Sequence, residues 1–269
     1  MVQERQLNIM RNGLGTRGPI EMDRDMLADV EKKLEKDPNN FILWVSRGIL
    51  YFNEDFEEAI ASFSKALAID PFNGDQYYNR GRKFLSQDRF PQALADFAIS
   101  LRLDPNDTWK WHFCGVAYYY LNNFHEAIKC FHKAIDLAEE KGDHMVPPEV
   151  DWIWMSYISL GDKENAAKCL EMVDENTPVE RGDLMYKKRI MLYKGLVTLE
   201  EFSKNIEYDN DKRAITELYG AANYCYHILG NPKMAVEFLD KLLTYTSSRH
   251  AFGYKMALLE RDKWVKEIK

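Results

Sequence analysis

Apolar residues recur along this chain at the spacing of amphipathic α-helices, and the pattern itself returns at a fixed interval. Three sets of residues follow a 34-residue step, namely Ala59, Ala93 and Ala127; Phe63, Phe97 and Phe131; and Gly81 and Gly115. Gly48 precedes Gly81 by 33 residues, one fewer than the step. A fixed period of this length is typical of a repeat architecture built from one supersecondary unit.

The repeat predicts three antiparallel helix pairs. First helices are expected over residues 41–52, 75–85 and 108–121, and second helices over residues 56–69, 90–103 and 124–137. The recurring glycines and alanines would allow the two helices of a pair to approach closely. Pro71 and Pro105 would end second helices, because proline disfavours helix at the preceding residue and cannot continue one.

One pair carries a known signature. Trp111-x-x-x-Gly115-x-x-Tyr118, followed by Ala127-x-x-x-Phe131-x-x-Ala134, resembles the tetratricopeptide repeat almost position for position. The resemblance covers three well-formed units over residues 41–141. It implies an all-α fold, a right-handed superhelical solenoid of antiparallel helix pairs with N- and C-terminal capping helices, whose first helices line a concave groove.

Weaker helix pairs follow over residues 147–246, within which residues 147–178, 183–207 and 213–246 each fit one degenerate pair. Trp154 stands where the fourth unit should have a small residue, so helix packing there is expected to differ. Residues 247–269 predict a C-terminal capping helix, with Phe252, Met256, Leu259 and Trp264 on one side.

The N-terminal 40 residues lie outside the repeat. Residues 21–40 predict a capping helix, with Leu27, Val30 and Leu34 on one face. Residues 1–20 are polar and glycine-rich and are interpreted as a flexible arm. Gly13, Gly15 and Gly18 match the dinucleotide-binding pattern, but that pattern needs a surrounding parallel sheet, and the downstream sequence has helical period.

Residues 190–264 also resemble, faintly, the C-terminal half of bacterial tetratricopeptide lipoproteins of the NlpI type. The resemblance is carried by Leu192-Tyr193-Lys194-Gly195, Gly230-Asn231-Pro232 and Ala257-Leu258-Leu259-Glu260. It implies a bacterial adaptor. The envelope location of that family is not expected here, because its signal peptide and lipid-accepting cysteine are not seen.

Composition narrows the class of partner. The formal net charge is −7 without a long basic run, which argues against nucleic-acid binding. No segment has the roughly 18 consecutive apolar residues of a membrane span, so no membrane contact and a cytoplasmic location are expected. The four cysteines form no CxxC pair, which favours reduced, buried thiols over a metal site.

No catalytic, cofactor or metal motif emerges. His125-Glu126 does not extend to a zinc motif because Lys129 holds the last position, and no nucleophile-elbow motif occurs. The best titratable candidates for catalysis are Asp75, Arg82 and His112. Their spacing matches no catalytic motif, so a non-catalytic protein is expected.

The repeat resemblance implies a binding groove on the first helices. Trp109, Tyr119 and Tyr120 are aromatic residues that the repeat does not need for packing, and such residues often anchor interfaces. Asn79 occupies a position at which many of these repeats bind a peptide backbone, whereas the remaining residues of the chaperone carboxylate clamp are not present. The predicted groove residues are Tyr78, Asn79, Arg82, Trp109, His112, Val116, Tyr119, Tyr120 and Met155.

The resulting functional hypothesis is a scaffold or adaptor that binds a peptide segment or partner helix of another protein in this groove. One alternative is a regulatory module that responds to a small ligand or signal peptide. Another is that the groove is filled by self-association into a homodimer, or by the chain's own N-terminal arm or C-terminal helices.

Overall fold

The computed structural model describes residues 23–268, and all regular secondary structure in that range is helical. The expected all-α fold of antiparallel helix pairs is therefore confirmed. The expected arm over residues 1–20, with its three glycines, lies outside the described residues. Contacts divide the chain between Ala134 and Ile135 into two compact units, which are taken in turn.

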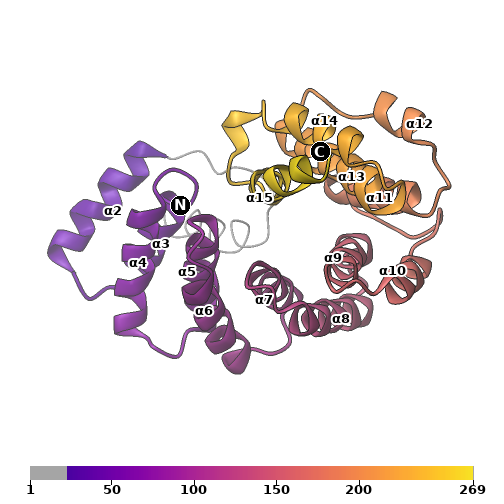
Figure 1. The fold of residues 1–269 in the computed structure, drawn as a ribbon. Coiled ribbons are helices and arrows are strands. Elements are labelled where there is room, and N and C mark those ends of the chain that lie inside the picture. Colours follow the sequence, from indigo (N-terminus) through magenta and orange to yellow (C-terminus); the bar gives the residue numbers. More distant parts are fainter. Residues whose placement is uncertain (1–22, 269) are drawn as a thin grey trace. The chain divides into compact units, whose positions relative to one another are not determined.

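The first unit contains the three predicted helix pairs and the predicted N-terminal helix (Figure 1). Each helix starts and ends within a few residues of its expected bounds. Its helices are α2 (Arg24–Lys36), α3 (Phe41–Leu50), α4 (Phe56–Ile69), α5 (Gly74–Ser86), α6 (Phe90–Leu103), α7 (Thr108–Tyr120) and the start of α8 (Phe124–Lys141).

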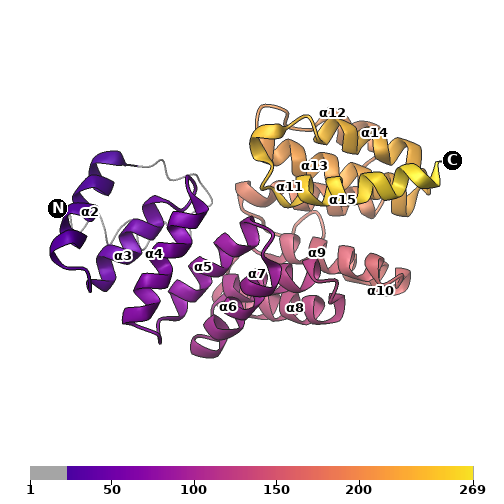
Figure 2. The same ribbon diagram turned by 60° about the vertical axis from the view of Figure 1, so that its left-hand side comes forward.

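Helices of the first unit pack in the order in which they follow one another. α2 packs on α3, and contacts then run from α3 to α4, α5, α6 and α7, while α5 also touches α7 directly (Figure 2). The first helices of consecutive pairs are therefore neighbours. The recurring alanines of the second helices are completely buried, at positions where a small side chain allows two helices to pack closely: Ala59, Ala93 and Ala127.

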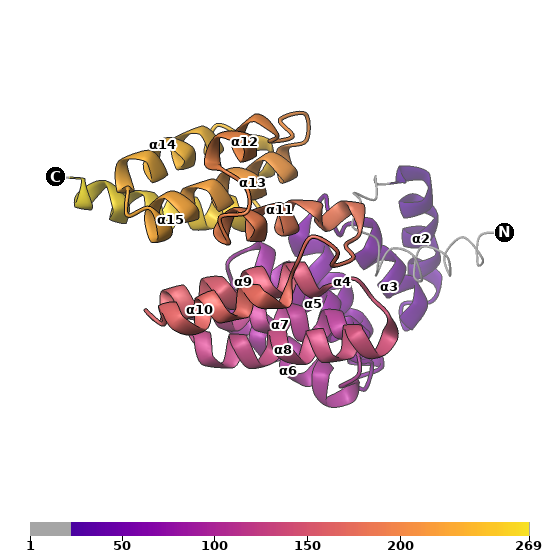
Figure 3. The same cartoon turned by 90° about the vertical axis from the view of Figure 1, so that its right-hand side faces the viewer.

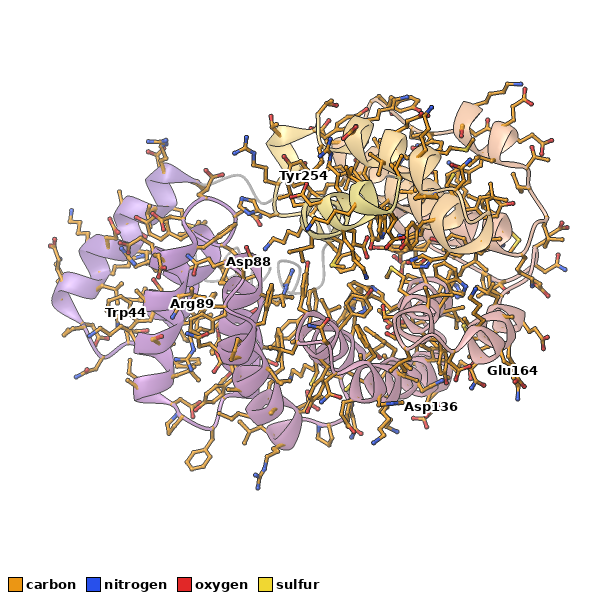
Figure 4. The ribbon with its side chains drawn as sticks, in the orientation of Figure 1. Trp44, Asp88, Arg89, Asp136, Glu164 and Tyr254 are labelled. Atoms are coloured by element: carbon orange, nitrogen blue, oxygen red, sulfur yellow. The ribbon has the colours of Figure 1, made fainter. Side chains whose placement is uncertain are left out.

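Helix ends in this unit follow ordinary capping chemistry. Asp55 and Asp107 accept backbone hydrogen bonds at the starts of α4 and α7. Asp88 and Asn122, 34 positions apart, have φ of 60° and 57° in the turns after α5 and α7. This left-handed conformation is one that Asp and Asn tolerate better than other non-glycine residues. Figure 4 marks Asp88 and also Arg89, the N-cap residue of α6, the second helix of the same pair.

Buried polar side chains tie neighbouring pairs together. Lys110 on α7 is buried, and its Nζ donates to carboxylate oxygens of Asp75 and Asp104, each at 2.8 Å. Burial lowers the pKa of Lys110, but the hydrogen bonds to Asp104 and Asp75 outweigh it and leave the pKa raised. Arg80 on α5 binds both carboxylate oxygens of Asp96 on α6, again at 2.8 Å. The Lys110 contacts therefore link one pair to the next, whereas the Arg80–Asp96 contact links the two helices of a single pair.

The second unit is built from shorter and less regular helices (Figure 3). α9 packs on α10 and α11, α11 on α13, and α13 on both α14 and α15. A π-helical turn, Tyr224–Ile228, follows α13. The α-helices that follow α8 are α9 (Val146–Ser159), α10 (Lys163–Cys169), α11 (Leu184–Tyr193), α12 (Leu199–Lys204), α13 (Asp211–Asn223), α14 (Pro232–Leu242) and α15 (Phe252–Glu267).

Packing around Trp154 differs from that of the regular pairs, as the sequence predicts. The Trp154 indole is buried and stacks on the Tyr193 ring, with ring centroids 4.1 Å apart and an interplanar angle of 14°. The nearby Arg189 is 1% exposed, and a Cβ built on Gly220 would lie 2.5 Å from its Cγ. Gly220 therefore makes room for a buried arginine.

The expected face of the last helix is partly wrong. Trp264 is buried as predicted, but Leu259 is 65% exposed. The buried side of α15 consists of Gly253, Tyr254, Ala257 and Trp264. Leu259 lies two residues beyond Ala257, which places it roughly 200° further round a helix of 3.6 residues per turn. α15 nevertheless packs on α13 and α14, as a capping helix should. Among residues 23–268, no helix combines the length and hydropathy that a bilayer span requires.

Candidate functional site

Nine residues were predicted to line a groove, and the structure places four of them at partly exposed positions. We name these four the first-helix face, since they lie on the first helices α5 and α7: Arg82, Trp109, His112 and Tyr120. The three on α7 follow helical spacing and therefore share one side of that helix. The other five predicted residues are buried, at 0–6% exposure: Tyr78, Asn79, Val116, Tyr119 and Met155.

Arg82 lies among three aromatic rings from successive elements. Its Cζ is 4.7 Å from the ring centroid of Phe52, which follows α3, and 5.0 Å from that of Phe113 on α7. The ring of Tyr78, one turn earlier on α5, is 5.4 Å away. Cation–π attraction of this kind contributes about 0.5–2 kcal/mol per contact. The rings therefore hold the guanidinium at one place on the face.

Tyr78 and Asn79 are buried residues of α5, three to four positions before Arg82. Burial raises the pKa of Tyr78 to about 12, so its phenol is neutral at physiological pH. Asn79 donates from Nδ2 to Oε1 of Gln76 at 3.2 Å, while its buried Oδ1 has no hydrogen-bond partner among the described residues. A buried acceptor without a donor costs free energy. The Oδ1 atom of Asn79 can therefore accept one further hydrogen bond.

Trp109 and His112 continue the face along α7. The His112 ring is 5.6 Å from that of Trp109 and meets it nearly edge-on, at 74°. Both contact Phe113, at centroid distances of 5.0 Å for His112 and 6.4 Å for Trp109. Phe113 therefore connects the Arg82 end of the face to the Trp109 end.

Tyr119 and Tyr120 depart from expectation, because both take part in packing. Tyr120 stacks on Phe90 of α6 with ring centroids 4.3 Å apart and planes 7° from parallel. Tyr119 meets Phe124 edge-on at 5.2 Å. The sequence prediction that the repeat does not need these two for packing is wrong, since each bridges a first helix to a second. Tyr120 still contributes a partly exposed surface.

Met155 belongs to the second unit. It is 3% exposed, and its Sδ lies 3.6 Å from Nη2 of Arg189. Its surroundings are therefore those of a buried core position in that unit.

The candidate catalytic residues have different kinds of partner. Asp75 pairs with Lys110, whereas the Arg82 guanidinium is surrounded by rings. His112 contacts aromatic rings, including that of Phe131 at 6.1 Å. In the part of the chain that the structure describes, no group of three or more His, Cys, Asp or Glu side chains is placed to hold a metal ion. The four cysteines are free and buried.

Phe113 is not among the groove residues that the sequence predicts. It lies four residues after Trp109 and therefore on the same side of α7. An apolar residue in a repeat is usually interpreted as core. The structure shows instead that its ring is shared by Arg82, Trp109 and His112.

Family comparison identifies the repeats. Two family models described as tetratricopeptide repeat match the chain, one over residues 34–108 and the other over residues 110–141. The chain therefore contains tetratricopeptide repeats over this region. Relatives include tetratricopeptide repeat-containing protein trd-1 of Caenorhabditis elegans, 28% identical over 53% of this chain and 17% of that protein. Mitochondrial import receptor subunit TOM70 of Homo sapiens is 25% identical over 80% of this chain and 36% of that protein.

Solved structures agree on the fold. A crystal structure of MamA matches with a TM-score of 0.53 at 19% identity, covering 63% of this chain and 86% of that one. A MamA structure from Desulfovibrio magneticus RS-1 matches with the same TM-score, covering 64% of this chain and 90% of that one. Identities this low show the fold alone. The chain spans 17% of the length of trd-1 and 36% of that of TOM70.

Proposed function

We propose that this protein is a non-catalytic adaptor, and that its first-helix face binds a peptide segment of a partner protein. The observation that carries the proposal is the aromatic surface of Trp109 and Phe113, joined to the Arg82 guanidinium on consecutive first helices. A surface of this kind offers large contact area at low conformational cost, together with fixed polar donors.

The repeat architecture supports the proposal. Tandem helical repeats present extended surfaces on which a peptide can contact several units at once. The partly exposed residues of the first-helix face come from two consecutive first helices, α5 and α7, and Phe52 adds a ring from the turn after α3. An extended peptide laid across these helices would meet each of them in turn.

Asn79 supports it further. Its buried Oδ1 has no hydrogen-bond partner, although buried polar atoms are nearly always paired. A peptide N–H group that reached this oxygen after a small side-chain movement would satisfy it. The resemblance of the unit to other tetratricopeptide repeats suggests the same role for an asparagine at this position.

The relatives point in the same direction. TOM70 is by name an import receptor subunit. Since this chain covers 36% of TOM70, the role of that whole protein is not transferred. The part that we carry over is recognition of a protein partner, which we place in the cytoplasm.

A peptide selection tests the proposal. A random dodecapeptide library displayed on phage would be selected against the full chain, and the affinity of synthetic copies measured by fluorescence polarisation. Trp109→Ala should weaken binding by about tenfold or more, in line with loss of an interface anchor. Ile99→Ala, at a 39% exposed position on α6, should leave the affinity unchanged.

Two results would count against the proposal. One is a selection that yields no peptides with measurable affinity. The other is an affinity that Trp109→Ala leaves intact in a variant whose circular dichroism spectrum and melting curve match those of the unmutated chain. Sedimentation of the free chain as a dimer that Trp109→Ala dissociates would instead assign the face to self-association.

A further inference from the structure

Arg82 has a full positive charge without an acidic partner. Among residues 23–268, the structure gives its guanidinium no hydrogen bond and no ion pair. Three other arginines of the same unit each have one: Arg47 binds Glu31 and Glu58, Arg80 binds Asp96, and Arg89 lies 3.6 Å from Glu57. Arg82 differs from these three arginines because its guanidinium contacts aromatic rings and no acidic side chain among the described residues.

The ring contacts of Arg82 leave its donors available. The rings around Arg82 attract its positive charge through their π-systems; they belong to Phe52, Tyr78 and Phe113. Unlike carbonyl or carboxylate oxygens, these rings do not take up the five N–H donors of the guanidinium. They do restrict the side chain. A guanidinium that is already positioned loses less conformational freedom when it binds, which raises affinity for a matching anion.

A second cation adds to the positive potential at this end of the face. Lys83 places its Nζ 3.4 Å from the centroid of the Phe52 ring, on which Arg82 also lies, and donates to the Phe52 carbonyl oxygen at 2.7 Å. Of the acidic side chains that act on Tyr78, Asp75 pairs with Lys110, which Asp104 shares, and Asp107 caps α7, while the buried Tyr78 phenol stays protonated. Arg82 and Lys83 together place two positive charges beside the Phe52 ring, and these attract an anion.

We propose that Arg82 recognises a carboxylate of the bound peptide, so that the first-helix face selects acidic segments. This inference rests on the peptide-binding function proposed above and names the chemistry of the partner. A planar guanidinium can donate two parallel N–H hydrogen bonds to the two oxygens of one carboxylate. The surrounding rings exclude water from one side of the contact, which strengthens it, and offer apolar surface to the residues on either side of the acid.

The site differs from a chaperone carboxylate clamp. The positions that supply lysine and asparagine in the first unit of such a clamp are occupied here by Val45 and Ile49, both buried. The contact proposed here uses one arginine within a ring of aromatic residues. A carboxylate can come from an aspartate or glutamate side chain or from a peptide C-terminus, and the experiment distinguishes the two.

The test compares peptide selections on the unmutated full chain and on the Arg82→Gln full chain, using the random dodecapeptide phage library. Peptides selected on the unmutated chain should be enriched in Asp and Glu, and those selected on Arg82→Gln should lose that enrichment while keeping their aromatic and apolar residues. Arg102→Gln, an exposed position on α6, is the matched control and should retain the acidic preference.

Synthetic peptides then identify the source of the carboxylate. Replacing the enriched Glu by Gln should weaken binding to the unmutated chain about tenfold, and should have almost no effect on Arg82→Gln. If amidation of the peptide C-terminus produces that loss instead, the terminal carboxylate is the group recognised. Arg82→Lys should bind with intermediate affinity, since it keeps the charge and loses the planar fork.

The outcomes separate the two proposals. Peptides that bind without acidic enrichment, or whose enrichment survives Arg82→Gln, would overturn the role of Arg82 and leave the peptide-binding function intact. Binding that Trp109→Ala fails to weaken would overturn the function itself. A melting temperature of Arg82→Gln close to that of the unmutated chain shows that lost selection is not lost folding.

Discussion

Phe131 of α8 occupies the space that a side chain on Gly115 of α7 would need, because a Cβ built on Gly115 would lie 2.6 Å from Cε1 of the Phe131 ring. The same relationship joins Gly81 to Phe97 at 2.7 Å and Gly48 to Phe63 at 2.6 Å. In each pair the phenylalanine is completely buried. The close approach expected from the recurring glycines is therefore confirmed, and it sets the spacing between the two helices of each pair.

We predict that Gly81→Ala destabilises the protein. Overpacking against Phe97 should cost about 1–3 kcal/mol, offset in part by the roughly 1 kcal/mol by which alanine favours helix over glycine. Urea denaturation followed by circular dichroism measures the net change. The double variant Gly81→Ala with Phe97→Leu should lose less than the sum of the two single losses, because the smaller side chain vacates the contested space. Strict additivity would show that the contact is not the cause.

A second prediction concerns the buried charges of the second unit. Asp151 and Arg189 are 0% and 1% exposed, with Oδ2 and Nη1 3.1 Å apart. The two are not aligned for a hydrogen bond, so both Asp151 carboxylate oxygens lack a donor. Arg189→Met should cost about 3–5 kcal/mol, because it leaves a buried carboxylate without a counter-charge.

The matched double variant, Asp151→Leu with Arg189→Met, should recover most of that loss. A buried ion pair can usually be replaced by apolar residues of similar volume at little net cost. Urea denaturation of the single and double variants measures the coupling. A double variant as unstable as the worse single variant would show that the pair itself stabilises the fold.

A third prediction follows from Glu260 on α15, whose Oε2 accepts from the Tyr219 hydroxyl at 2.9 Å. Burial raises the Glu260 pKa from 4.5 to about 7, against the opposing effects of Tyr219, Lys263 and Arg189. A raised folded-state pKa means that the folded state holds the proton more tightly. This contribution to stability is complete below pH 4.5 and is lost as the pH rises through 7.

Glu260→Gln cannot ionise and so should not show this loss. Between pH 4.5 and pH 7.5, the free energy of unfolding of Glu260→Gln relative to the unmutated chain should rise by about 1–3 kcal/mol. Taking the difference cancels other titrating groups, including His227, whose pKa burial lowers to about 4. A difference that stays flat across this range would contradict the assignment.

The regular repeats could be predicted from sequence because the same residue types recur at the same positions of each unit and make the same contact there. Gly81 and Phe97 recur one step later as Gly115 and Phe131, so a periodicity read without a structure predicts both the helices and their contact. The proposed site was only partly predictable. Arg82 and Trp109 were found from their positions in the repeat, whereas the packing of Tyr120 on Phe90 depends on the turn between repeats, which the sequence pattern does not describe.

The buried ion pair of the second unit could not be predicted from sequence. Arg189 is a residue type that is usually solvent-exposed, and nothing in the pattern around it indicates that Gly220 leaves space for its side chain. Its partner Asp151 lies 38 residues earlier in the chain. Such a buried pair becomes visible only when the helices that carry it are assembled.

Photo-crosslinking tests the central claim most directly. A peptide selected on the full chain would be synthesised with one benzophenone side chain, crosslinked to the unmutated protein, and its attachment site found by mass spectrometry. The account predicts attachment to residues of α3, α5 or α7, at or beside Arg82 and Trp109, with unlabelled peptide abolishing the crosslink. Attachment confined to α4, α6 or the second unit would contradict it.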